Sequence, residues 1–69
     1  MNVMERFPTL IAAVRSFPEH EQDEVIWVLS NPKRSAEALA SKLRAAGRKV
    51  SASTIRTYRR ELAREQGNV

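Results

Sequence analysis

The sequence predicts an all-α protein, a compact bundle of four short helices. Two observations carry this prediction. Apolar residues recur at helical spacing in successive segments, and no alternating apolar run or Asn-Gly type turn indicates a strand. A chain of 69 residues without cysteine allows one domain, 1–69, with a small core and no disulfide. We expect a supporting helical hairpin over 1–32 and a second pair of helices over 33–66.

The first helix is predicted over 8–15, where apolar residues at i, i+3, i+4 and i+7 form one stripe: Phe7, Leu10, Ile11 and Val14. Pro8 suits the first turn of this helix, because its missing N–H needs no partner there. The hairpin therefore begins with a short helix that has one apolar side.

A second helix is predicted to begin at residue 17 or 18 and to end at residue 29. Ser16 lies three residues before Glu19, which is the spacing of a capping box, so we expect Ser16 to cap this helix. Pro32 disfavours the α region at Asn31 and should end it.

The end of the second helix, "VIWVL" at 25–29, is apolar on all sides. Such a helix is central to the fold, or it covers another chain. Trp27 therefore has two interpretations: it fills the core, or it forms a dimer surface together with Val28.

The third helix is predicted to follow Ser35 as its N-cap and to stop before Gly47. Its apolar stripe is Ala36, Leu39, Ala40 and Leu43. The fourth helix is predicted over 52–66, with Ser51 as its cap. Its buried face is expected to include Val50, Ile55, Tyr58 and Leu62.

The charge is distributed unevenly along the chain. Residues 1–32 contain two arginines and five acidic residues, a net charge of −3, whereas residues 33–69 contain ten basic residues and three glutamates, a net charge of +7. The two parts together give the formal net charge of +4. This asymmetry indicates a basic functional surface on a less basic support.

The side of the fourth helix opposite its apolar face carries a polar stripe: Ser53, Thr57, Arg60 and Arg64, with Arg56 beside it. The major groove of DNA is about 12 Å wide and admits an α-helix. Small hydroxyl residues allow close approach to base edges, and an arginine such as Arg60 can bind guanine through two hydrogen bonds. The stripe therefore predicts contact with double-stranded DNA.

Basic residues around this helix are expected to contact DNA phosphates: Lys33, Arg34, Arg48, Lys49, Arg59 and Arg64. Such neutralisation supplies most nonspecific affinity and makes binding salt-dependent. Arg59 lies close to the apolar face, so an acidic residue of the first two helices is its alternative partner. For the basic surface as a whole, the alternatives are a solvated face or an acidic protein partner.

Residues 35–62, "SAEALASKLRAAGRKVSASTIRTYRREL", resemble the helix-turn-helix unit of small bacterial and actinobacterial phage DNA-binding regulators. Ala40 stands at the position of the motif's small helix-contact residue, and Gly47 stands at its turn. The spacing from Gly47 through "VSASTI" is similar to that of arginine-repressor-like domains. Those domains continue into a β wing, which is not expected here. The resemblance implies a homeodomain-like fold with its second helix in the major groove.

The resemblance assigns base contacts to Ala52, Ser53, Arg56 and Thr57, and phosphate contacts to Ser51 and Thr54. Each has a structural alternative. Ser51 is also expected to be a helix cap, and Thr54 can bond the helix backbone. Tyr58 belongs to the core rather than to a base-stacking surface.

Other classes of function have little support in the sequence. His20 is the only histidine and lies between two glutamates, so no catalytic, metal or cofactor site is predicted. No apolar run has the roughly 20 residues of a membrane span. The segment "MNVMERFPTL" has no secretion-signal pattern. We expect a non-enzymatic protein in the cytoplasm, associated with the nucleoid.

The sequence therefore predicts sequence-specific binding of double-stranded DNA in transcriptional control, as in a phage or prophage repressor. A homodimer would supply two recognition helices for two half-sites. Two alternatives remain. One is a DNA-packaging or architectural component, such as the DNA-binding part of a small terminase subunit. The other is a protein-interaction module that inhibits a host factor through the acidic hairpin.

Overall fold

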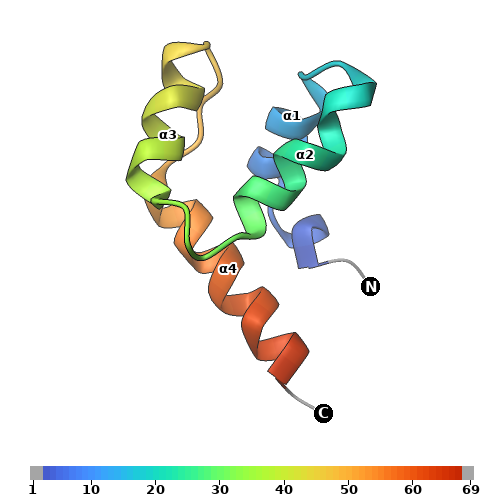
Figure 1. Cartoon of the computed structure of the whole chain (residues 1–69), viewed down its shortest axis with the longest axis vertical. Coiled ribbons are helices and arrows are strands. Elements are labelled where there is room, and N and C mark those ends of the chain that lie inside the picture. The colour runs from blue at the N-terminus through green and yellow to red at the C-terminus, as the bar shows by residue number, and fades with distance from the viewer. Residues whose placement is uncertain (1–2, 68–69) are drawn as a thin grey trace.

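The computed structural model describes residues 3–67, and in this range it contains four α-helices, one short 3-10 helix and no strand (Figure 1). In chain order the elements are η1 (Val3–Arg6), α1 (Pro8–Arg15), α2 (Glu19–Ser30), α3 (Ala36–Ala45) and α4 (Ala52–Gly67). The all-α prediction is confirmed. The 3-10 helix was not predicted, although it buries Val3 and Met4. The single domain predicted over 1–69 extends two residues beyond the described range at each end.

The longest helix, α4, is the element on which the others assemble. It packs against α3, α2 and η1, while α1 packs against α2 and η1. Helices α2 and α3 both approach α4 at one end and diverge from each other at the other end, and the C-terminal end of α4 extends away from them (Figure 1). The core lies where these elements meet. Its most deeply buried side chains come from different segments: Leu10, Leu29, Val50 and Ile55.

Tyr58 connects three parts of this core. It is buried, as predicted, and its ring meets Phe7 edge to face, with 5.8 Å between the ring centroids. Its hydroxyl lies 3.0 Å from the Ser30 hydroxyl at the end of α2. A buried phenol needs such a partner, because an unbonded hydroxyl in a core is costly. The segment before α1, the end of α2 and the middle of α4 therefore meet at one side chain.

The predicted signals at most helix ends are confirmed. Pro8 opens α1, and Asn31 ends α2 in an extended conformation. Ser35 caps α3, where its hydroxyl accepts a hydrogen bond from the Ala38 N–H at 3.2 Å. Gly47 ends α3 with a φ of 84°, a left-handed conformation that residues with a Cβ rarely adopt.

The turn at Gly47 closes α3 with two backbone hydrogen bonds. The Gly47 N–H donates to the Arg44 carbonyl at 3.0 Å, and the Arg48 N–H donates to the Leu43 carbonyl at 2.8 Å. This pair of bonds is the Schellman pattern, which satisfies carbonyls that a helix end leaves unpaired. The turn fixes the direction in which the chain leaves α3 toward α4.

The prediction that Ser16 caps the second helix is wrong. Helix α2 begins at Glu19 with no side-chain cap, and Ser16 ends α1, where its hydroxyl donates to the Ala13 carbonyl. The reason lies in Pro18, which is extended with a ψ of 145°. Proline also disfavours the α region at the preceding residue, so a helix cannot run from Ser16 through the Phe17–Pro18 pair.

The interpretation of Trp27 as a core residue is also wrong. Its side chain is 59% exposed, and it is the one large hydrophobic residue among residues 3–67 that is exposed to this degree. Of its neighbours, Leu29 is fully buried, whereas Val28 is half-buried. The apolar end of α2 therefore faces both the core and the solvent.

Arg59 of α4 binds the C-terminal end of α2. Its Nε donates to the Leu29 carbonyl at 2.8 Å and its Nη2 to the Val28 carbonyl at 3.2 Å. Its Nη1 donates to the Arg34 carbonyl in the following loop at 2.6 Å. The last carbonyls of a helix lack partners within it and carry the negative end of the helix dipole. A single guanidinium therefore satisfies both needs and joins α2, the loop and α4.

Arg59→Ala should lower the free energy of unfolding by about 1.5–3 kcal/mol, because hydrogen bonds to a charged group contribute on this scale. The exposed neighbour supplies the matched control: Arg60→Ala should change stability by no more than about 0.5 kcal/mol. Urea unfolding followed by circular dichroism measures both. Equal effects of the two variants would contradict the role assigned to Arg59.

Candidate nucleic-acid interface

The N-terminal turn of α4 is held by its own hydroxyl groups. The Ser51 hydroxyl accepts a hydrogen bond from the Thr54 N–H at 3.1 Å, which confirms Ser51 as a cap. It also lies 2.8 Å from the Thr54 hydroxyl. Ser51 and Thr54, the two hydroxyl residues predicted to contact phosphate, are therefore bonded to each other. Together they order the start of the helix.

The polar stripe of α4 begins directly after this turn. Ser53, Arg56 and Arg60 are exposed, and Thr57 is partly exposed. These four residues are spaced i, i+3, i+4 and i+7, which places them on one side of the helix. Ala52, a fifth predicted base contact, is half-buried and packs against the core instead. The structure thus brings four of the five predicted base contacts together on a solvent-facing surface.

Arg56 does not stand alone on this surface, because its guanidinium makes an ion pair with Glu37 in the first turn of α3. Both side chains are largely exposed. The backbone N–H at Glu37, followed by the hydrogen bond and charge of Arg56, holds the pKa of the Glu37 carboxyl below its ordinary value. The pair joins the starts of α3 and α4, and an exposed pair of this kind is easily opened.

Four cations around the stripe have no partner in the described part of the chain. The side chains of Lys33, Arg34, Lys49 and Arg60 are exposed and make no ion pair or hydrogen bond. The bond from Arg59 to the Arg34 carbonyl places the loop of Lys33 and Arg34 beside the middle of α4. Lys49 lies two residues before the cap of α4. The free positive charge therefore surrounds the first half of the helix.

Three other arginines predicted to contact phosphate are bonded within the protein. Arg59 binds backbone carbonyls, as described above, and partial burial lowers the pKa of its guanidinium. Arg48 donates to the Ser16 hydroxyl and to the Ser16 carbonyl at 3.1 Å. Its guanidinium also covers the Phe17 ring at 3.9 Å from the centroid, a cation–π contact. Arg48 thus fastens the turn after α3 to the corner between α1 and α2.

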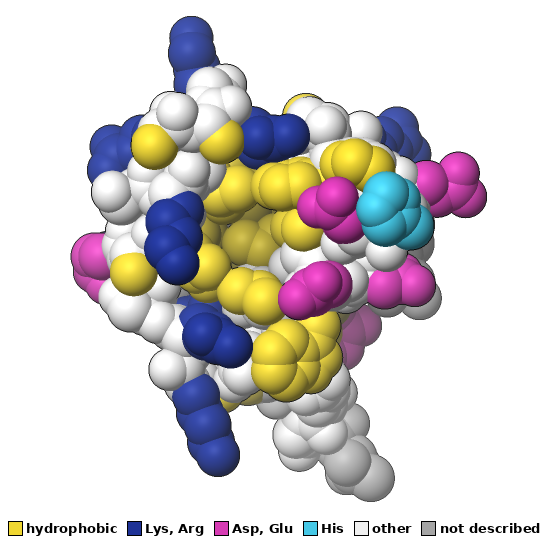
Figure 2. Space-filling model, turned by 45° about the horizontal axis from the view of Figure 1, so that its top comes forward, with side chains coloured by type: hydrophobic (Ala, Val, Ile, Leu, Met, Phe, Trp, Pro, Cys, Tyr) yellow, Lys and Arg dark blue, Asp and Glu magenta, His cyan; other side chains and the backbone are white. Residues whose placement is uncertain are grey.

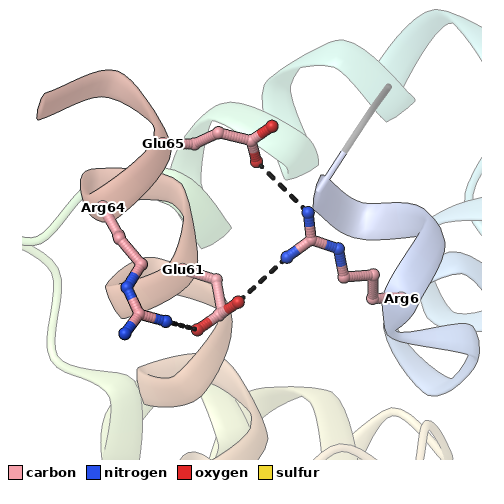
Figure 3. A network of polar contacts seen from close by, with 4 residues as sticks. All are labelled: Arg6, Glu61, Arg64 and Glu65. Atoms are coloured by element: carbon pink, nitrogen blue, oxygen red, sulfur yellow. Dashed lines mark hydrogen bonds and ion pairs between the residues drawn. The ribbon is translucent and has the colours of Figure 1, made fainter. Parts of the chain in front are cut away.

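Arg64 belongs to a network at the other end of α4 (Figure 3). It lies 3.4 Å from Glu61, which in turn accepts a hydrogen bond from Arg6 at 2.9 Å. Arg6 also reaches Glu65 at 3.6 Å. The network ties η1 to the C-terminal half of α4, and Glu61 occupies Arg64, the last residue of the predicted polar stripe.

Sequence reasoning missed Glu37 and Arg6. The Glu37–Arg56 pair joins residues 19 apart, and the Arg6–Glu61 pair joins residues 55 apart, so no local spacing marks either pair. A signal for Glu37 did exist, since it is the acidic residue in the first turn of a helix predicted to lie beside the recognition helix.

Among residues 3–67, no helix is both long and apolar enough to cross a membrane. Within the same range, no cluster of three or more potential metal ligands occurs. Comparison of the chain with protein-family models, with curated proteins and with solved structures finds no match.

The Glu37–Arg56 pair can be tested through the carboxyl group. A lowered pKa means that the pair contributes above the ordinary pKa of glutamate and is lost as the pH falls through the lowered value. Arg56→Ala should raise the Glu37 pKa only part of the way, because the backbone hydrogen bond remains. An NMR titration of the side-chain carboxyl carbons measures the change, with Arg15→Ala as the control. An unchanged Glu37 pKa in Arg56→Ala would contradict the pair.

Proposed function

We propose that the protein binds double-stranded DNA through a helix-turn-helix formed by α3, the turn at 46–51 and α4. The observation that carries the proposal is the sorting of charge around α4. The three glutamates of residues 33–69 all pair with arginines, whereas six cations of this range are unpaired; four of them surround the polar stripe, and Lys42 and Arg44 lie on α3. The exposed polar stripe is therefore surrounded by most of the unpaired positive charge of this part of the chain.

The stripe has the chemistry for reading bases in the major groove. Ser53 and Thr57 are short and can donate to or accept from base edges, while Arg56 and Arg60 can each bind guanine O6 and N7. Helix α4 has 16 residues, and among its first five Arg56 is the one bulky side chain that is exposed. A helix of this kind can approach the base edges closely with its N-terminal half, as recognition helices do.

In this proposal the phosphates are contacted by the unpaired cations on either side of the stripe: Lys33, Arg34 and Lys49. Each phosphate that they neutralise should add roughly −0.9 to the slope of log affinity against log salt. The three arginines bonded within the protein have a structural role in this proposal. Arg48 holds the turn and Arg59 holds the end of α2, so these two orient α4, while Arg64 pairs with Glu61 within α4 itself.

Transcriptional control is the role that we assign to this activity, with one recognition helix for each half-site. One helix contacts only a few base pairs, so useful specificity needs two copies. Glu37 fits such a role, because a carboxylate that holds Arg56 across the surface restricts the positions that the guanidinium can reach. The pair can open when guanine offers Arg56 a better partner.

The proposal is tested by selection from a pool of randomised DNA duplexes at physiological ionic strength, followed by sequencing. We expect an enriched inverted repeat with half-sites about one helical turn apart. Retention without an enriched motif would overturn sequence-specific reading and favour an architectural or packaging component. No retention even at low salt would contradict DNA binding and favour a protein partner for the acidic surface of α2.

Arg56→Ala should weaken binding of the selected site by about 1–3 kcal/mol and relax the preference at one base position, because a good bidentate contact discriminates on this scale. Lys49→Ala should weaken all sequences alike and reduce the salt slope by about one. Arg15→Ala removes the same charge from α1 and is the matched control, expected to change neither property. Fluorescence anisotropy with labelled duplexes measures all three. Equal losses in the three variants would indicate attraction by net charge alone.

A further inference from the structure

An open apolar groove lies between α2 and α3, on the side of the molecule where these two helices diverge. It has a volume of about 400 Å³. Its large apolar lining side chains are Phe17, Val25, Val28, Leu29, Leu39 and Leu43. Figure 2 shows hydrophobic side chains gathered in this hollow. In a protein of 69 residues, such an apolar hollow exposes surface that association would stabilise.

The two rims of the groove carry opposite charges. Glu21 and Glu24 of α2 line one side, and Lys42 of α3 lines the other. Figure 2 shows the same division, with acidic side chains on one side of the hydrophobic hollow and basic side chains on the other. None of these three residues pairs across the groove, and among them only Glu21 has a partner, its neighbour His20.

This arrangement is complementary to itself. When two copies face each other across a two-fold axis that runs along the length of the groove, the acidic rim of one copy meets the basic rim of the other. Contacts of this kind repeat on both sides of the axis, as in isologous dimers. A partner of uniform charge, by contrast, would be repelled by one of the two rims. The charge pattern therefore favours a second copy of this chain.

Trp27 supplies an anchor for such a contact. It does not line the groove itself, but it lies three residues after Glu24, about 60° further around α2, and so lies next to the acidic rim. It is 59% exposed in the single chain. Tryptophan is among the residues that dominate interface energetics, because its large ring buries much area with little entropy loss. Each copy thus offers one large apolar side chain and one apolar hollow.

The groove and the polar stripe lie on different sides of α3. Leu39, Lys42 and Ala46, which line the groove, are roughly 140–200° around the helix from Glu37, which faces Arg56. Occupation of the groove would therefore leave the polar stripe of α4 open.

We propose that the groove between α2 and α3 is a homodimer interface, with the Glu21–Glu24 rim of each copy set against Lys42 of the other and with Trp27 at its border. The dimer forms without DNA, so this inference can fail while DNA binding stands, and the reverse also holds.

The test is a charge exchange followed by analytical ultracentrifugation without DNA. The Glu21→Lys/Glu24→Lys variant has two basic rims, and Lys42→Glu has two acidic rims. All three positions are exposed, so the changes should leave the fold intact, which circular dichroism checks. Each variant alone should dimerise about tenfold more weakly than the wild type. An equal mixture of the two should form a mixed dimer with affinity close to that of the wild type.

Trp27, the only tryptophan, gives a second readout, since its fluorescence should shift to shorter wavelength as the wild-type concentration rises. Arg56→Ala should leave dimerisation unchanged. A wild-type chain that stays monomeric up to millimolar concentration would overturn the proposal and assign the groove to another occupant. Dimerisation that is unchanged in the two charge-exchanged variants would also overturn this interface. So would an equal mixture of the variants that dimerises no more tightly than either variant alone.

Discussion

The binding of the α2 carbonyls by Arg59 is the interaction on which the rest of the structure depends. Helix α2 has no basic residue in its last turn, and the chain leaves it in an extended conformation at Asn31. Its final carbonyls therefore need donors from elsewhere in the fold, and Arg59 supplies them from the middle of α4. The adjacent Tyr58 meets Ser30 at the same helix end. Two consecutive residues of α4 thus set the direction of α2 and, through Arg34, the path of the loop that leads to α3.

The arginines of this chain illustrate how one residue type acquires different roles. Arg48 and Arg59 are fastened to backbone carbonyls, Arg6 and Arg64 are held by glutamates of α4, and Arg60 points freely into solvent. Arg48 and Arg59 fix the turn before α4 and the packing of α2 against it, and so they set the orientation of α4. Charge composition alone cannot separate these roles, because it counts every guanidinium alike. The separation comes from tertiary contacts, which decide which cations remain available to a polyanion.

Local signals in the sequence were sufficient for the helices and insufficient for their contacts. Pro8, Ser35, Gly47 and Ser51 act within one turn of the chain, so their effects were predictable. The prediction that Ser16 caps α2 failed because the conformational restriction at Phe17–Pro18 outweighs the capping-box spacing of Ser16 and Glu19. Trp27 could not be placed, because periodicity does not tell an interface from a core when a helix end is apolar on all sides. The Arg48, Arg56 and Arg59 contacts bridge distant segments, and no spacing rule anticipates them.

We propose that the first half of α4, with the loop at 31–35 and the turn at 46–51, is the surface that meets DNA. The most direct test is an NMR titration of the isotope-labelled protein with a short duplex at low salt, read as shifts of each backbone amide. We predict that the shifts concentrate at residues 33–37 and 49–57, while α1 and the Arg6–Glu61 contact stay unchanged. Shifts confined to α2 or to the end of α4, or no shifts at any duplex concentration, would contradict the account.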